Sequence, residues 1–216
     1  MNAKLITLSG IDGSGKSTQI TSIQNYYRKL NSPFVYLWTR GGSTPGIEII
    51  KLLSRKVAGK KLPPSGHSIQ RDQMFKKNWI QNMWLMLSIL DLLRIYSINI
   101  RWELWRGKTV ICDRYLWDTL IDFKIMFPYI EIENWLLWKA LVWCAPEPDV
   151  ELLLMIPIEL SEKRCLQKFD PFPDTKEQRI LRYALYKETS NLNKWSIIDA
   201  TQPEEAVFVQ IKHKLS

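Results

Sequence analysis

The sequence predicts an α/β fold in which a five-stranded parallel sheet is covered by helices on both faces. Short apolar or β-branched runs alternate with longer stretches of helical pattern, and this alternation is typical of parallel sheets. The chain has 216 residues, 46% of them apolar, which is enough for one α/β domain with a buried core. A glycine-rich segment between the first run and the first helical stretch is the third observation.

The five runs predicted as strands are Leu5–Ser9, Phe34–Trp38, Thr109–Asp113, Glu151–Met155 and Trp195–Asp199. Helices are predicted near residues 16–30, 46–57, 72–106, 116–127, 131–144, 159–167, 175–191 and 203–214. Pro33 ends the first helix, and Pro146 and Pro148 set off the fourth strand. No repeat or low-complexity linker divides the chain, so we expect one domain over residues 1–216.

The net charge of +8 is concentrated in one segment, residues 51–78. This segment has one acid, Asp72, and eight basic residues: Lys51, Arg55, Lys56, Lys60, Lys61, Arg71, Lys76 and Lys77. It is predicted to be a basic insertion in the domain. A solvated loop and a surface that faces an anion, such as a nucleotide, a polyanion or acidic lipid headgroups, both fit this charge.

Three scattered cysteines, Cys112, Cys144 and Cys165, form no CxxC pair and are interpreted as reduced thiols of a cytoplasmic protein. The N-terminal residues lack the apolar core of a signal peptide. The most apolar window, residues 83–93, is shorter than the roughly 20 residues that span a bilayer. A buried helix is therefore predicted there.

Polar residues in this long helical stretch recur three or four positions apart: Ser88, Asp91, Arg94, Ser97 and Arg101. Such spacing places them on one face of a helix. The remaining apolar sides are then expected to be buried against the sheet or against a second subunit.

The strongest motif runs from Gly10 to Ser17 and fits the pattern of Gly, four residues, then Gly-Lys-Ser. Its glycines let backbone N–H groups surround an anion, and the following helix adds the positive end of its dipole. Lys16 is expected to reach the β- and γ-phosphates of ATP, and Ser17 to ligate Mg²⁺. The predicted nucleotide-binding residues are Gly10, Asp12, Gly13, Ser14, Gly15, Lys16, Ser17 and Thr18.

Charged side chains follow three other predicted strands, and in a parallel sheet these strand ends meet at one edge. Asp113 can hold Mg²⁺ or orient an acceptor, and the planar donor fork of Arg114 suits a phosphate. Arg40, beside two glycines, suits a second phosphate. A surface ion pair and an arginine that caps a loop are the alternatives for these residues.

A basic segment at 160–174 contains Lys163, Arg164 and Lys168, and it is predicted to be a short lid that stabilises a transferring phosphoryl group. An exposed helix end is the alternative. Thr201 and Gln202, in the turn after the last strand, can offer backbone atoms to a base. Pro203 at a helix start explains the same turn structurally.

Together these pieces resemble the thymidylate kinase family of nucleoside monophosphate kinases. The matching motifs are "GIDGSGKST" from Gly10, "TRGGSTPG" from Thr39, "DRY" from Asp113, the basic lid, and "DATQP" from Asp199. They occur in the family's order and span nearly the whole chain.

The resemblance implies ATP as donor, Mg²⁺, a nucleoside monophosphate acceptor with dTMP the first candidate, and often a homodimer through long helices. Within it, Lys16 and Ser17 serve ATP and Mg²⁺, Asp12 the acceptor sugar, Arg40 and Arg114 phosphate, and Asp113 the metal and the acceptor. Some members have a catalytic arginine at the position of Gly13. Here the lid is expected to supply that cation through Lys163, Arg164 or Lys168. No nucleic-acid partner is expected.

Two segments depart from the family pattern. In "LSILDL" (87–92), Ser88 and Leu92 stand where the family has a stacking Phe and an Arg, whereas Asp91 is kept and Arg94 could replace the arginine. In "DTLIDF" (118–123), Asp118 and Asp122 can share one side of a helix. They either contact the acceptor or pair with Arg40, Arg94 or Arg114.

These departures leave other acceptors open, namely another nucleotide, a deoxynucleoside or a metabolite with a hydroxyl group. A hydroxyl acceptor requires a carboxylate base, and Asp113, Asp118 or Asp122 could supply one. A nucleotide-dependent switch or a module that binds an anionic membrane surface is the alternative of a different class. Acceptor-dependent turnover distinguishes the enzyme from such a module.

Overall fold

The central sheet has the predicted architecture of five parallel strands. The computed structural model describes residues 3–39, 77–166, 174–190 and 195–215. Its strands are β1 (Leu5–Gly10), β2 (Phe34–Trp38), β3 (Thr109–Asp113), β4 (Val150–Met155) and β5 (Ser196–Asp199). Their order is β2-β3-β1-β4-β5, and every neighbouring pair is parallel. All residues of the central strand β1 are buried.

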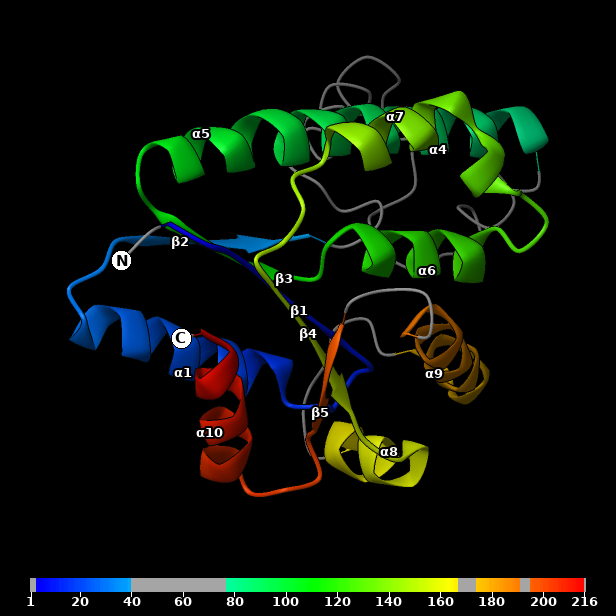
Figure 1. Ribbon diagram of the computed structural model, residues 1–216. Coiled ribbons are helices and arrows are strands. Elements are labelled where there is room, and N and C mark those ends of the chain that lie inside the picture. Colours follow the sequence, from blue (N-terminus) through cyan, green and yellow to red (C-terminus); the bar gives the residue numbers. More distant parts are fainter. Residues whose placement is uncertain (1–2, 40–76, 167–173, 191–194, 216) are drawn as a thin grey trace, which may run out of the picture.

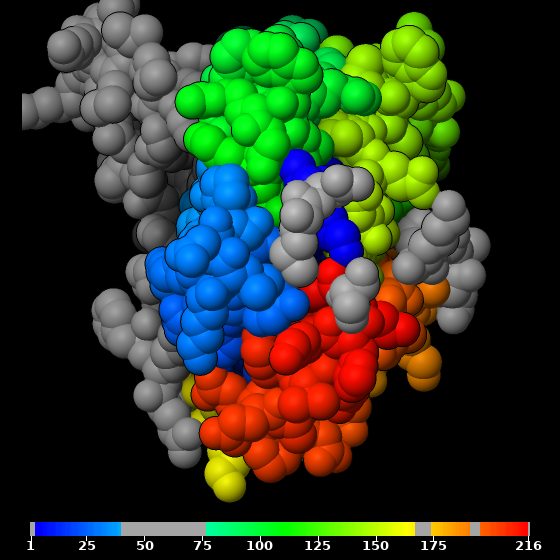
Figure 2. All heavy atoms as spheres, turned by 60° about the vertical axis from the view of Figure 1, so that its left-hand side comes forward, coloured from blue at the N-terminus to red at the C-terminus, as the bar shows by residue number. Residues whose placement is uncertain are grey.

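Helices cover both faces of this sheet, as predicted (Figure 1). One face carries α1 (Lys16–Lys29) and α10 (Glu204–Leu215), whose surfaces lie side by side in Figure 2. The other carries α4 (Asn78–Leu93), η2 (Arg94–Ile100), α5 (Arg101–Trp105), α6 (Leu116–Met126), the short η3 (Ile132–Asn134) and α7 (Leu136–Cys144). Each face therefore has its own buried apolar core.

Two further helices, α8 (Ile158–Leu166) and α9 (Lys176–Ser190), lie beyond the carboxyl ends of β1 and β4 (Figure 1). The predicted boundaries differ from the observed ones by a few residues. For example, β1 extends to Gly10 because Gly10 still pairs with Leu154 of β4. The predicted helix at 46–57, most of the basic insertion at 51–78, and Arg40 lie outside the described residues.

The long helix was expected over residues 72–106, and the described part is helical from Asn78 to Trp105. At 28 residues it is long and apolar enough by composition to cross a membrane, which the shorter window 83–93 did not indicate. However, Leu85, Ile89 and Leu92 on one face are fully buried in the core shared with β3, α6 and α7. One side of this helix is therefore part of the protein interior.

Candidate active site

The order of the strands places the loops after β1 and β3 next to each other. Leu8 of β1 pairs with Asp113 of β3, so both strands end at the same edge. After β1 the chain turns through the phosphate loop and enters α1 at Lys16. Gly10 allows this turn because a Cβ there would lie 2.5 Å from the carbonyl oxygen of Leu154. The predicted phosphate loop therefore has the flanking strand and helix that its function requires.

Lys16 lies across this loop. Its Nζ donates to the carbonyl oxygens of Gly10 and Ile11, both at 2.9 Å, and it is 3.9 Å from Asp12. Burial lowers the pKa of Lys16 to about 8, and the positive charge of Arg114 contributes to this shift. Lys16 therefore keeps its charge at neutral pH, where it can meet the phosphates of a nucleotide.

Asp113 has the features of a metal ligand. The Tyr36 hydroxyl donates to Asp113 Oδ2 at 3.3 Å. The other carboxylate oxygen, Oδ1, is buried and has no hydrogen-bond partner among the described residues. Ser17 lies at the start of α1. Carboxylate and hydroxyl oxygens are ligands that Mg²⁺ prefers, so this pair of donors fits that ion.

Arg114 follows Asp113 with a left-handed backbone conformation, φ 72°. Its buried guanidinium donates to Asp12 of the phosphate loop at 2.9 Å and to the Tyr186 hydroxyl at 3.2 Å. Burial alone would lower the pKa of Arg114, but Tyr186 and the acids Asp122 and Asp12 outweigh burial and raise it. A permanent cation thus connects the end of β3 to the phosphate loop.

Asp118, in the first turn of α6, lies next to the Arg114 guanidinium. Its carboxylate accepts hydrogen bonds from the Ser9 hydroxyl at 2.6 Å and from the Tyr186 hydroxyl, and it lies 3.7 Å from Arg114. Burial raises the pKa of Asp118, whereas Arg114 opposes that shift. The predicted pairing of Asp118 with Arg114 is therefore present.

Asp122, one turn further along α6, pairs with Arg182 of α9 at 2.5 Å. The same guanidinium binds Asp174 through Nε at 2.6 Å and Nη2 at 3.2 Å. Neither Arg182 nor Tyr186 was predicted from the sequence to be a site residue. Their spacing was the one feature of the sequence that pointed to them. Arg182 and Tyr186 lie four residues apart on α9, as Asp118 and Asp122 do on α6, so each pair can share one face of its helix.

The phosphate loop also packs against α8. Ser161 Oγ donates to the Asp12 carbonyl oxygen at 2.6 Å. Arg164 donates to the carbonyl oxygens of Gly13 at 3.3 Å and of Ala200 at 3.1 Å. Arg164 therefore bridges the loop and the turn after β5, while Lys168 lies outside the described residues.

The turn after β5 is stabilised by Asp199, whose Oδ1 accepts from the amide of Thr201 at 3.0 Å and from its hydroxyl at 2.7 Å. Thr201 and Gln202 are exposed. Both residues are thus accessible to a ligand, and Arg164 connects their turn with the phosphate loop.

A family model described as thymidylate kinase matches residues 8–211 of this chain. The chain belongs to the thymidylate kinase family. Its relatives include a thymidylate kinase of Prochlorococcus marinus (strain NATL2A), 27% identical over all of this chain and 97% of the relative. A thymidylate kinase of Carboxydothermus hydrogenoformans is 24% identical over 98% of this chain and 96% of the relative. A probable thymidylate kinase of Pyrococcus abyssi is 23% identical over 100% of this chain and 98% of the relative.

Membership of the thymidylate kinase family makes the chain an ATP-dependent kinase of nucleotides. It also bears on Gly13, the position at which some members were expected to have an arginine. A Cβ at Gly13 would lie 2.9 Å from the Ser161 carbonyl oxygen and 3.2 Å from Cys165 Sγ. This member of the family has no room for a side chain there as long as α8 packs on the loop.

The polar residues of the segment expected to read the acceptor base differ in their burial. Ser88 is fully buried and donates to the Trp84 carbonyl oxygen, and Leu92 is also fully buried. Arg94 is exposed and binds Asp91 through Nε at 2.9 Å and Nη2 at 2.8 Å. Ser88 is therefore buried in the core, whereas Arg94 lies at the surface.

Proposed function

We propose that this kinase transfers the γ-phosphate of ATP to a nucleoside monophosphate, with dTMP as the first candidate. One observation carries the proposal: the phosphate loop and the Asp113–Arg114 pair lie at the same sheet edge, where Arg114 binds Asp12 of the loop. A donor site and an acceptor cation are therefore adjacent. The curated relatives named as thymidylate kinases support dTMP as the candidate.

In this proposal the loop amides and Lys16 hold the β- and γ-phosphates of ATP, while Thr201 and Gln202 lie on the side of the base. Ser17 and Asp113 would hold Mg²⁺, and bound Mg²⁺ would neutralise charge on the phosphate oxygens. The lid residues Arg164 and Lys168 are proposed to stabilise the phosphoryl group in transfer. Arg164 must first leave the carbonyl groups that it binds in this structure.

Arg114 and Arg40 are proposed to hold the phosphate of the acceptor, and Asp12 its sugar. An acceptor phosphate is already nucleophilic, so no strong general base is required. Asp118 and Asp122 are engaged by Tyr186 and Arg182 rather than free to act as a base. Catalysis then rests on positioning and on charge stabilisation.

A second candidate keeps the chemistry but changes the acceptor. Ser88 and Leu92, at the positions where the family is expected to read thymine, are both buried in the core. Asp91 and Arg94 bind each other. The side chains expected to select thymine are thus absent or occupied, and this observation favours another nucleotide as a second candidate.

We further propose a single kinase domain over residues 1–216, located in the cytoplasm and active as a homodimer through the long apolar helix. The basic insertion at 51–78 and the lid at 160–174 are proposed as parts of this domain. The scattered spacing of the three cysteines, with no CxxC pair, supports a reducing compartment. A small-molecule acceptor, rather than a nucleic acid, is the proposed partner.

The test is an ATP-coupled assay that compares dTMP with the other nucleoside monophosphates and with nucleosides. ADP formation that depends on dTMP supports the first candidate, whereas turnover with a different compound alone replaces it. Lys16→Ala should abolish transfer without loss of the folded state, because it removes the cation at the phosphates. Slow ATP hydrolysis that no acceptor accelerates would contradict the proposed phosphotransfer.

A further inference from the structure

Two buried hydroxyl groups form a chain that ends on the backbone of Arg114, and a third lies beside the start of this chain. Tyr96 Oη donates to Thr39 Oγ1 at 3.1 Å, and Thr39 Oγ1 donates to the Arg114 carbonyl oxygen at 2.9 Å. Thr119 Oγ1 lies 3.3 Å from Tyr96 Oη. Each of the three residues is at most 1% exposed, so water does not compete for these bonds. This hydroxyl chain connects η2 and the end of β2 with the residue after Asp113.

The direction of the hydroxyl chain follows from the number of protons. A carbonyl oxygen can only accept, so Thr39 must give its one hydroxyl proton to Arg114. Thr39 can then only accept, and it accepts from Tyr96 at 3.1 Å. Thr119 gives its own hydroxyl proton to the Tyr115 carbonyl oxygen at 3.1 Å, so Thr119 does not donate to Tyr96 and the chain begins at the Tyr96 hydroxyl. The Tyr96 hydroxyl is therefore the donor that holds Thr39 in the orientation that reaches Arg114.

The peptide at the end of this chain has an unfavourable conformation. Arg114 has φ 72°, in the left-handed region that is unfavourable for a non-glycine residue. Its N–H donates to the Leu8 carbonyl oxygen at 2.9 Å, and its carbonyl accepts from Thr39. Such a conformation persists only where surrounding bonds enforce it. Here it directs the Arg114 guanidinium toward Asp12 of the phosphate loop.

Tyr96 reaches this position from η2, which is a π-helix between two α-helices. Its wider turn buries Ile95 and Ile100, five residues apart, together with Tyr96. The Tyr96 ring also packs against Tyr115, with centroids 4.5 Å apart. Short π-helical turns within α-helices frequently occur at functional sites. The proposed phosphotransfer itself assigns no role to Tyr96 or to this turn.

We propose that Tyr96 is a positioning residue, which acts through Thr39 to hold the Arg114 peptide in the conformation that presents its guanidinium to the acceptor phosphate. Tyr96 does not touch the substrate. The inference rests on the proposed function, because it takes Arg114 as the ligand of that phosphate. It extends that function to Tyr96, which none of the motifs includes.

The first test compares the kinetics of Tyr96→Phe with those of Tyr27→Phe. Tyr96→Phe keeps the ring and removes only the hydroxyl, which donates to Thr39 and also contacts Thr119. We expect the KM for dTMP to rise roughly 2- to 10-fold, the range of one lost hydrogen bond, with kcat and the KM for ATP within about 2-fold of wild type. Tyr27 is an equally buried tyrosine, which packs in the core of α1, and its variant should keep all three values.

A second series tests whether the hydroxyl groups act as one chain. Thr39→Ser keeps the central hydroxyl and should retain the wild-type KM for dTMP. Thr39→Val removes it and should resemble Tyr96→Phe. The double variant Tyr96→Phe/Thr39→Val should be no worse than Thr39→Val alone, because both changes interrupt the same chain. Additive losses would overturn the proposal.

A third measurement needs no substrate. Hydrogen exchange of the Arg114 amide, followed by NMR, should become several-fold faster in Tyr96→Phe than in wild type and stay unchanged in Tyr27→Phe. Unchanged exchange in Tyr96→Phe would overturn the positioning role. If wild type phosphorylates no acceptor, the proposed function fails, and exchange at Arg114 still decides this inference.

Discussion

At the scale of single residues, Gly13 shows how closely the phosphate loop and α8 depend on each other. Gly13 has φ 78°, and a Cβ there would lie 2.9 Å from the Ser161 carbonyl oxygen. Gly107 has nearly the same φ, 77°, but a Cβ there would meet nothing within 4 Å. The two glycines thus share a backbone conformation and differ in the space around it.

Gly13→Ala should therefore weaken ATP binding, whereas Gly107→Ala should not. Both variants should lose roughly 1 kcal/mol or more of unfolding free energy, because alanine is disfavoured at positive φ. Only Gly13→Ala also has to displace α8 from the loop, so we expect its Kd for Mg²⁺-ATP to rise at least about 10-fold. Calorimetric titration measures the affinity, and equal affinities of the two variants would refute the close packing.

A second residue-scale prediction concerns Glu151 of β4. Burial raises the pKa of Glu151 to about 7, with a contribution from the negative charge of Asp118. Since the folded state prefers the protonated acid, ionisation destabilises it, and the free energy of unfolding should fall as the pH rises from 5 to 8. Urea unfolding across this range measures the effect.

Glu151→Gln should reduce this pH dependence, because the amide does not ionise. Glu188→Gln, an exposed position on α9, is the matched control and should follow the wild-type profile. An identical slope in wild type and Glu151→Gln would show that Glu151 does not titrate in this range.

At the scale of elements, α6 and α9 are joined by two buried polar contacts one turn apart. Tyr186 donates to Asp118, and Arg182 binds Asp122. Arg182 also binds Asp174 just before α9, and all three charged side chains are at most 6% exposed. Removal of one partner from such a buried group leaves an uncompensated charge.

Arg182→Leu should therefore lower the free energy of unfolding by about 3–5 kcal/mol. Arg94→Leu is the matched control, since Arg94 also binds an aspartate, Asp91, through Nε and Nη2 but is 47% exposed, and it should cost about 1 kcal/mol or less. Denaturant unfolding of both variants measures the difference. Similar losses would show that burial does not set the strength of the Arg182 contacts.

The same two helices show where prediction from the sequence ended. Motif order and the rule that parallel strands end at one edge were sufficient to predict that Asp113 and Arg114 lie beside the phosphate loop. The partner of Asp122 could not be predicted in this way, because α9 contains several charged residues and periodicity does not say which of them faces α6. The rotation of one helix against another is set by packing, which the sequence shows only indirectly.

At the scale of the whole molecule, the sheet and its order of layers were predictable, whereas the long helix was only partly so. Alternating strands and helices predicted the parallel sheet with both faces covered. The prediction from polar spacing treated this segment as an uninterrupted α-helix, but the structure has the π-helix η2 at Arg94–Ile100, and Ser88 of α4 is buried in the core. Because no residue type signals a π-turn, Tyr96 was not recognised as part of the site.

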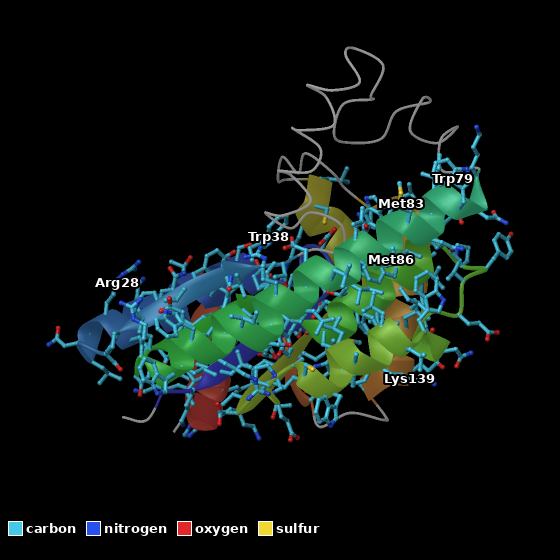
Figure 3. The ribbon with its side chains drawn as sticks, turned by 90° about the horizontal axis from the view of Figure 1, so that it is seen from above. Arg28, Trp38, Trp79, Met83, Met86 and Lys139 are labelled. Atoms are coloured by element: carbon cyan, nitrogen blue, oxygen red, sulfur yellow. The ribbon has the colours of Figure 1, made fainter. Side chains whose placement is uncertain are left out.

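The outer side of this helix carries an apolar surface, which is the proposed interface of the homodimer. Large side chains 44–78% exposed follow it across α4, η2 and α5: Trp79, Met83, Met86, Leu90, Ile98, Trp102 and Trp105. Figure 3 looks down on this face and labels Trp79, Met83 and Met86 on α4. Monomeric proteins rarely expose so continuous an apolar surface, which supports contact with a second copy.

Ile98→Glu should therefore convert a dimer into a monomer, because it would bury a carboxylate against apolar side chains of the partner. Val209→Glu, on the exposed side of α10 across the sheet, adds the same charge and should leave the dimer intact. Sedimentation velocity at micromolar concentration distinguishes the two species. A dimer that tolerates Ile98→Glu would move the interface away from this helix. A wild-type monomer that binds vesicles containing phosphatidylglycerol, and loses that binding in Ile98→Glu, would assign the apolar surface to a membrane instead.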